Sequence, residues 1–273
     1  MNRGEKFTDK PFGYYVDKIH RRIFRRVLEY KVLDSRLATE LDLRKKSIID
    51  TLGLSEQVVD SIEIKDHLEK ACLTGLKAEF ELFLTIYCTL VVDHLLDMVE
   101  QTGHIPDAHK GIVDVVQDKN RFFRGFMQSG LRDARRLFIE QAVPSHGLDR
   151  LVGVLNKCGW TVFERLEQAE RSGFSVDLGE PIENPWTQIK MSFQVRHAIE
   201  HSFSKVGKPF LFKTKALWRD TTWSRHFDPQ SGPELGQRVL IDGVDICRTA
   251  SSMTWVASML REHWQEALGN SSA

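Results

Sequence analysis

The sequence predicts an all-α fold, in which a helical bundle is preceded by a smaller helical N-terminal region. Two observations predict it. Proline is scarce from Tyr14 to Ile105, and apolar residues recur there at the three- and four-residue intervals of an amphipathic helix. Apolar residues make up 41% of the 273 positions, which is enough to bury a globular core. We therefore expect an N-terminal helical region over 1–65 and a helical domain over 66–273.

The first predicted helix is basic. Ile19, Ile23 and Val27 form an apolar stripe at intervals of four, and the remaining surface carries His20, Arg21, Arg22, Arg25 and Arg26. The forked arginine side chain suits phosphate oxygens, so these four arginines are candidate nucleic-acid-binding residues. A solvated face, or a surface that pairs with another subunit, also accounts for the same charges and is favoured over phosphate contact.

The next segment, residues 37–52, resembles a helix-turn-helix unit. Small Ala38 is expected where two helices cross, with a shared apolar core of Leu41, Leu43, Ile48 and Leu52. Asp42 stands at the turn, where glycine is usual because it adopts the left-handed conformation without strain. The segment is either a DNA-reading unit or a helical extension that binds a partner or a second copy.

The domain over 66–273 is predicted to consist of several helices joined by loops. A long core helix is expected at 64–101, closed by Gly103 and Pro106. Asn184-Pro185-Trp186 opens a further helix with proline in its first turn, and Gly207 with Pro209 ends it. Residues 206–238 are predicted to be an irregular loop with short strands at 209–212 and 238–241. The other predicted helices are 108–120, 131–141, 148–168 and 242–267.

Composition also bears on the compartment and the partners. The cysteines Cys72, Cys88, Cys158 and Cys247 form no Cys-x-x-Cys pair, so buried free thiols are expected in place of a zinc ribbon or a redox dithiol. No apolar signal segment and no membrane span are visible, and a cytoplasmic location without membrane contact follows as an expectation. Lys plus Arg and Asp plus Glu both number 38, so any attraction for nucleic acid must be local.

The stretch Arg196-His197-Ala198-Ile199-Glu200-His201 carries the chemistry. At about 100° per residue, its charged and imidazole side chains fall within about 140° of one helix face. Phe193, Ile189 and Trp186 precede them on that face, which predicts that a second subunit or a ligand covers it. Histidine can take or give a proton at neutral pH, and arginine can stabilise negative charge on phosphorus oxygens. This set suits RNA cleavage, in which the 2′-hydroxyl itself supplies the nucleophile.

The same stretch, with Trp186 before it and Gly207 after it, resembles the signature of the HEPN superfamily, whose ribonuclease members carry Arg, four to six residues and then His. The resemblance covers the motif helix and extends from about Leu68 to His263. It implies a HEPN-like helical bundle and a metal-independent endoribonuclease that acts on RNA as a homodimer and needs no cofactor. Here Arg196 would stabilise the transition state, His201 would act as general acid or base, and His197 would assist. By analogy, an inhibitory partner protein and a role in prokaryotic defence or toxin systems are expected.

Alternatives to this interpretation remain open. Arg196 and Glu200 are spaced to form an ordinary ion pair at i, i+4. Asp93 and Asp97 either form a buried polar network or support the motif helix from the facing side. Arg219 and His226 repeat the Arg-to-His spacing in the predicted loop, where no site is expected. The competing function is a non-catalytic helical module that binds RNA or a nucleotide, or that binds DNA through 37–52.

Overall fold

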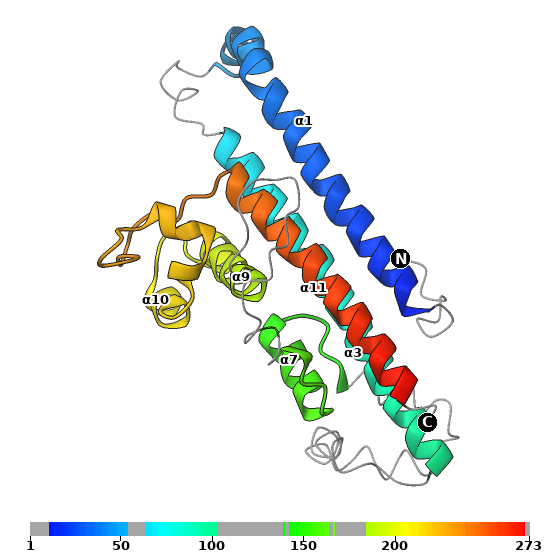
Figure 1. Ribbon diagram of the computed structural model, residues 1–273. Helices are drawn as coiled ribbons and strands as arrows, with labels where there is room; N and C mark the ends of the chain where they lie inside the picture. The colour runs from blue at the N-terminus through cyan, green and yellow to red at the C-terminus, as the bar shows by residue number, and fades with distance from the viewer. Residues whose placement is uncertain are drawn as a thin grey trace. The chain divides into compact units, whose positions relative to one another are not determined.

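The fold is all-α, as predicted. The computed structural model describes residues 11–53, 64–102, 139, 142–163, 166 and 184–270 (Figure 1). In these ranges no strand forms, and the backbone bridges Lys205↔Arg238 and Asp228↔Gly232 are isolated. No helix in the described ranges is both long enough and apolar enough to cross a membrane. The described helices are α1 (Phe12–Leu52), α3 (Ile64–Thr102), α7 (Leu148–Lys157), α9 (Pro185–His201), α10 (Lys208–Thr214), η3 (Trp218–Asp220), η4 (Thr222–His226) and α11 (Gly243–Asn270).

The chain divides into two compact units that interleave along the sequence. The first unit comprises Met1–Ile19, Glu79–Ala169 and Val256–Ala273, and the second comprises His20–Ala78 and Glu170–Trp255. Each unit contains one part of α1, α3 and α11, because these long helices run on from one unit into the other. The predicted division into 1–65 and 66–273 stays a prediction.

Aromatic side chains form the core of the first unit. Trp264 of α11 contacts Phe12, Tyr87 and Trp160, with ring centroids 5.6, 6.2 and 5.9 Å apart. The buried indole of Trp160 donates a hydrogen bond to the Tyr87 hydroxyl at 2.5 Å. Burial of large aromatic rings, with the polar tips paired, accounts for the packing of these helices against one another.

In the second unit, α1, α3 and α11 meet at Tyr30. Its ring is buried, and its hydroxyl donates to the buried carboxylate of Glu69 at 3.4 Å. Gly243, the first residue of α11, lies so close that a Cβ there would be 2.9 Å from the Tyr30 hydroxyl. Burial, and then the Glu69 carboxylate, raise the pKa of Tyr30 above its ordinary value, so the phenol stays protonated.

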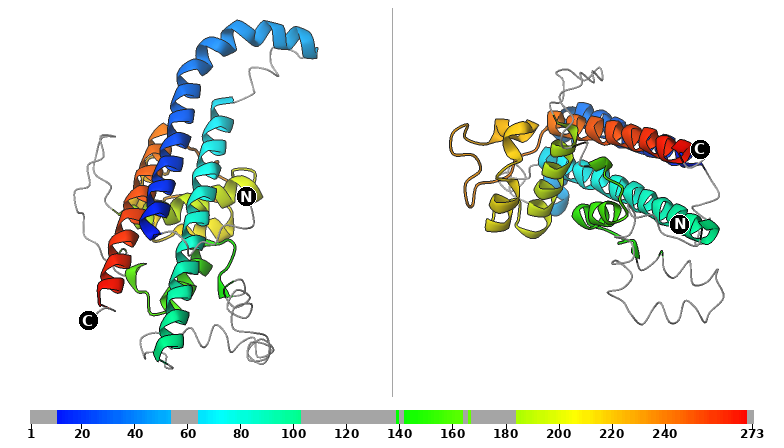
Figure 2. Two further views of the ribbon diagram at one scale, coloured as in Figure 1. Left: turned by 90° about the vertical axis from the view of Figure 1, so that its right-hand side faces the viewer. Right: turned by 60° about the horizontal axis from the view of Figure 1, so that its bottom comes forward.

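The turn predicted at Asp42 does not form, because α1 continues without a break from Phe12 to Leu52. Figure 2 shows the light-blue end of α1 as a curved but unbroken helix. Leu52, predicted to lie in a shared core, is 63% exposed, whereas the side chains of Ala38, Leu41, Leu43 and Ile48 lie outside the described residues. An aspartate in the left-handed backbone conformation that a turn needs costs about 1–2 kcal/mol of conformational free energy. An aspartate in the right-handed helical conformation costs only a fraction of that, so continuation of the helix is favoured.

The predicted helix at 148–168 is also interrupted. α7 ends at Lys157, and Gly159 follows with φ +72, the left-handed conformation that commonly ends a helix. The amide of Gly159 donates to the carbonyl of Asn156 at 2.9 Å, and that of Trp160 donates to Leu155 at 2.9 Å. The long core helix at 64–101 and the last helix at 242–267 are confirmed by α3 and α11. The predicted helices 108–120 and 131–141 lie almost entirely outside the described residues.

The predicted loop over 206–238 contains α10, η3 and η4 in place of strands. The strand predicted at 209–212 is wrong, because α10 covers these residues with Gly207 as its N-cap and Pro209 in its first turn. Proline is favoured in the first turn of a helix. At 238–241 only the isolated bridge of Arg238 to Lys205 forms. Trp218, Trp223 and Phe227 are buried, so this segment has an apolar core of its own.

Gly232 and Gly236 test how closely this core is packed. Both have positive φ, +76 and +83, but a Cβ on Gly232 would lie 2.8 Å from the Trp218 ring, whereas one on Gly236 meets nothing within 4 Å. We expect Gly236→Ala to lower the free energy of unfolding by about 1–2 kcal/mol through backbone strain. Gly232→Ala should lower it by about 1–3 kcal/mol more, because the Trp218 contact adds overpacking. Urea denaturation of both variants measures the difference, and equal losses would contradict it.

Candidate active site

α9 begins as the sequence predicts. Asn184 is its N-cap, and the Asn184 side-chain oxygen accepts a hydrogen bond from the amide of Thr187 at 2.9 Å, with Pro185 in the first turn. Met191, Val195 and Ala198 are buried, which holds the helix in the second unit. This packing fixes the direction in which the last turn of α9 presents Arg196 and the residues after it.

The apolar start of the polar face is covered within the chain itself. Trp186 and Ile189 are fully buried and Phe193 is nearly so. The ammonium group of Lys77, from α3, lies 5.3 Å from the centre of the Phe193 ring. The prediction that a second subunit or a ligand covers this end is therefore wrong: intramolecular packing already removes these side chains from water.

The last turn of α9 brings the four predicted polar side chains together. Arg196 forms an ion pair with Glu200, and the other oxygen of Glu200 lies 3.8 Å from Nε2 of His201. The rings of His197 and His201 lie 4.5 Å apart, centroid to centroid. The His201 side chain is 60% exposed, whereas Arg196 and Glu200 are each about a quarter exposed. The result is a pair of accessible imidazoles beside a guanidinium that a carboxylate holds in place.

Electrostatics distinguish His197 from an ordinary surface histidine. Partial burial lowers the pKa of His197, and the neighbouring cationic groups of His201, Lys213 and Arg196 lower it further. The neutral imidazole is therefore favoured at neutral pH, as a general base requires. Within the described structure, the buried Nε–H of Arg196 has no hydrogen-bond partner, and a catalytic role is one of the recognised explanations for an unmatched buried donor.

Asp93 and Asp97, the predicted supporting residues, belong to a different unit from this turn. Both belong to α3 in the first unit, whereas Arg196 and His201 belong to the second. Asp93 is buried and Asp97 is half-buried. Their predicted role beside the motif helix stays a prediction.

The basic face of α1 shows ordinary ion pairing on the same helix. Arg25 pairs with Glu29 at 2.7 Å and Arg26 approaches the same carboxylate at 3.7 Å. Arg21 is exposed and Arg22 is half-buried. Pairs at i, i+3 and i, i+4 are typical of a solvated helix face, so the phosphate-binding interpretation of these arginines stays a prediction.

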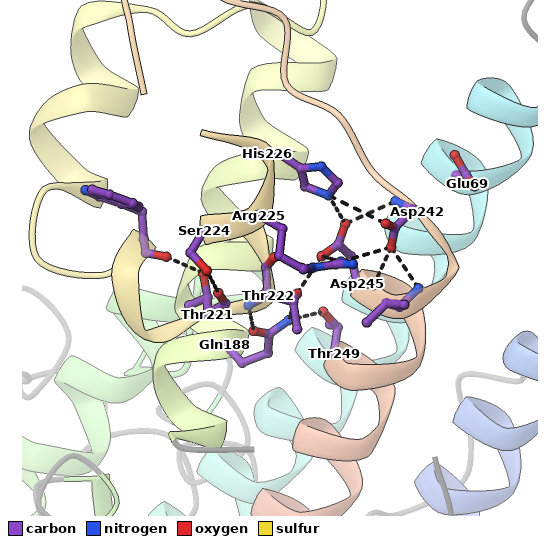
Figure 3. Close-up of polar contacts among 12 residues, drawn as sticks. Glu69, Gln188, Thr221, Thr222, Ser224, Arg225, His226, Asp242, Asp245 and Thr249 are labelled. Carbon is purple, nitrogen blue, oxygen red and sulfur yellow. Dashed lines mark hydrogen bonds and ion pairs between the residues drawn. The ribbon is translucent and has the colours of Figure 1, made fainter. Parts of the chain in front are cut away.

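His226, to which the sequence assigned no role, lies in a charged cluster at the start of α11. Figure 3 shows its ring and the Arg225 side chain pointing from η4 toward Asp242 and Asp245. Nε2 of His226 is 2.8 Å from the fully buried carboxylate of Asp245. Arg225 donates to Asp242 and to Asp245, each at 3.1 Å. Arg219, the other half of the repeated spacing, instead lies over the Trp218 ring at 4.7 Å.

The two aspartates of this cluster also cap α11. Asp242 accepts from the amides of Val244 and Asp245 at 2.8 and 3.1 Å, and Asp245 accepts from the amide of Asp242 at 3.0 Å. This reciprocal arrangement is a capping box, and the spacing Asp-x-x-Asp before an apolar run is its sequence signal. His226, Asp242 and Asp245 offer ligand atoms within 4.8 Å of one another. Because the Arg225 cation already pairs with both carboxylates, we interpret the cluster as structural.

His226 should make the stability of the protein depend on pH. The hydrogen bond to Asp245 raises the pKa of His226 above its ordinary value of about 6.5. A group whose pKa is higher in the folded state than in the unfolded state stabilises the folded protein. This stabilisation is complete below the pKa of the unfolded state, and it is lost as pH rises through the pKa of the folded state. We therefore expect the melting temperature to fall as pH rises above about 6.5, and His226→Gln to reduce the fall. Thermal melts of both proteins across that range measure it; parallel curves would contradict it.

No protein-family model, no curated protein and no solved structure matches the chain. The resemblance to the HEPN superfamily therefore depends on Arg196, His197 and His201 and on the residues around them.

Proposed function

We propose that the protein is a metal-independent endoribonuclease of the HEPN type, with its active site at the last turn of α9. The observation that carries the proposal is the contact between His197 and His201, whose exposed rings are 4.5 Å apart beside Arg196. The pKa of His197 is lowered, so its neutral ring is available as a base beside a second imidazole, the side chain type that serves as an acid near neutral pH. General acid–base cleavage needs this combination.

The proposed reaction uses the RNA's own hydroxyl group. Neutral His197 accepts the 2′-hydroxyl proton as the 2′-oxygen attacks phosphorus, and protonated His201 donates a proton to the 5′-oxygen as the P–O5′ bond breaks. The products are a 2′,3′-cyclic phosphate and a 5′-hydroxyl, so atoms and charge balance. Arg196 stabilises the charge that gathers on the phosphorus oxygens. Glu200 is a positioning residue, because it pairs with Arg196 and lies near His201.

The proposal includes a homodimer, in which the last turns of two α9 helices face one RNA phosphate. The exposure of His197 and His201 leaves this turn accessible to a second copy and to substrate. An inhibitory partner protein, in a defence or toxin setting, belongs to the proposal by analogy alone.

A non-catalytic RNA-binding module is the second candidate. It is favoured by the Arg196 ion pair to Glu200, because such a pair at i, i+4 also forms on helices without any catalytic role. The DNA-reading version loses its structural basis with the missing turn at Asp42.

Incubation of the purified protein with RNA in excess chelator separates the candidates. The enzyme should cut and leave cyclic phosphate ends, which resist phosphatase until acid opens the ring. Binding without cutting would favour the second candidate, and cutting only after addition of a divalent metal would overturn the mechanism.

A further inference from the structure

Cationic side chains gather in the segment that follows the last turn of α9. From His201 to Arg219 the chain contains no Asp or Glu, although the whole sequence has a formal net charge of zero. A local excess of this size attracts polyanions even when the molecule as a whole does not. The basic residues of the segment are all exposed: Lys205, Lys208, Lys213, Lys215 and Arg219.

An aromatic side chain lies among these cations on α10. Phe210 and Thr214 anchor the buried side of this helix, whereas the Phe212 ring is 85% exposed. At about 100° per residue, Lys208 and Lys215 fall within about 60° of Phe212 around the helix axis. Phe212 is therefore an exposed ring flanked by two ammonium groups along one stripe of α10.

Phe203 is a second solvent-exposed aromatic residue, and it follows the last turn of α9. It is 92% exposed, and its backbone is in the left-handed region, with φ 51. Left-handed conformations cost non-glycine residues about 1–2 kcal/mol, and they persist only where neighbouring structure imposes them. Here the amide of Ser204 donates to the carbonyl of Ala198 at 3.1 Å, and the amide of Val239 donates to the carbonyl of Ser204 at 2.8 Å. The exposed ring is thus held on a firmly bonded turn.

Both rings lie near the proposed active site. Phe203 follows His201 by two residues. A Cβ on Gly207, the N-cap of α10, would lie 3.9 Å from Oγ of Ser202, so the start of α10 packs beside the end of α9. Lys213 of α10 is close enough to His197 to interact with it electrostatically.

We propose that Phe203 and Phe212 are base-stacking residues of a single-stranded RNA surface, with Lys208, Lys213 and Lys215 contacting the phosphates. This inference rests on the proposed function and names its substrate as unpaired RNA. Aromatic rings stack on any base face, and nearby cations follow the backbone. In a duplex the base faces are covered by their neighbours, so paired RNA cannot use the rings in this way.

Charge argues against a second copy of the chain as the occupant of the α10 part of this surface, as distinct from the α9 turn that the proposed homodimer brings together. In a two-fold symmetric interface each patch meets itself, so the basic segment of one copy would face the basic segment of the other. Like charges brought together in this way disfavour association. A flexible polyanion with exposed bases complements both the rings and the ammonium groups.

Fluorescence anisotropy with a labelled 2′-O-methyl oligouridine tests the surface, because this strand binds but cannot be cut. We expect Phe203→Ala and Phe212→Ala each to weaken binding about tenfold, as loss of base stacking does. Phe203→Gly should weaken binding equally while removing the left-handed strain, so misfolding cannot explain the loss. Phe24→Ala is the matched control, because Phe24 is a 68% exposed ring on the basic helix α1, and it should bind like the parent.

A salt titration adds an independent readout. Lys208→Gln and Lys215→Gln should each reduce the slope of log affinity against log salt by about 0.7, the value for a lost phosphate contact on a single strand. Unchanged affinity in the double variant of Phe203 and Phe212, or loss only in Phe24→Ala, overturns the proposal. A dimer that becomes monomeric in that double variant overturns it too, because the face would then be a protein interface.

Cleavage is measured separately, with unmodified RNA. If the parent does not cut but the binding losses appear as expected, the RNA surface stands and the ribonuclease fails. If the parent cuts and the phenylalanine variants bind and cut as the parent does, the surface fails and the ribonuclease stands.

Discussion

His201→Ala is expected to lower the rate of RNA cleavage by about 10²–10⁴-fold, the usual contribution of a positioned general acid or base. His197→Ala should lose a similar factor, and Arg196→Ala about 10²–10³-fold, because its cation stabilises the transition state. The double variant of the two histidines should lose little more than either single variant, since the groups act as a unit. Initial rates in excess chelator measure all four variants.

A matched control is available on α3. His67 is an exposed histidine of the same unit, and His67→Ala should cut at the parent's rate. The lowered pKa of His197 further predicts that the acid limb of the rate profile lies below about pH 6.5, the ordinary histidine value. His197→Ala should abolish that limb. If the histidine and arginine variants all cut as fast as the parent, the α9 site is wrong.

Asp245→Ala is expected to destabilise the second unit strongly. Its fully buried carboxylate accepts hydrogen bonds from Thr222 at 2.5 Å, from Arg225 at 3.1 Å and from the amide of Asp242 at 3.0 Å. The same carboxylate holds His226. Removing one partner of a buried charge pair leaves the others unmatched, so we expect a loss of about 3 kcal/mol in the free energy of unfolding.

Urea denaturation of Asp245→Ala and a control variant tests this expectation. Asp220→Ala removes an exposed carboxylate from η3 and should change stability by less than about 0.5 kcal/mol. Asp245→Asn keeps the shape of the side chain but not its charge, and should fall between the two. A loss for Asp245→Ala no larger than that of the control would show that the cluster contributes little.

Local rules were sufficient for α3, for α11 and for the start of α9. The helical spacing of apolar residues predicted α3 and α11, and Asn184 with Pro185 predicted the start of α9. The same rules failed where two local options differ by little energy. Asp42 continues a helix in place of turning, and Gly159 ends one where the periodicity predicted continuation. Such choices amount to about 1 kcal/mol each, which packing overrides readily.

By itself the sequence determined the all-α fold and the grouping of Arg196, His197, Glu200 and His201, because the 3.6-residue period of a helix places residues i, i+1, i+4 and i+5 on a common face. Only the tertiary structure decided what surrounds that face. Two of the features that it decided are contacts between residues distant in the chain: Lys77 lies over the buried Phe193 ring, and His226 contacts Asp245. The third is the exposure of Phe203 and Phe212, which depends on the packing around them. Periodicity records which residues share a helix face, whereas burial depends on which other elements pack against it.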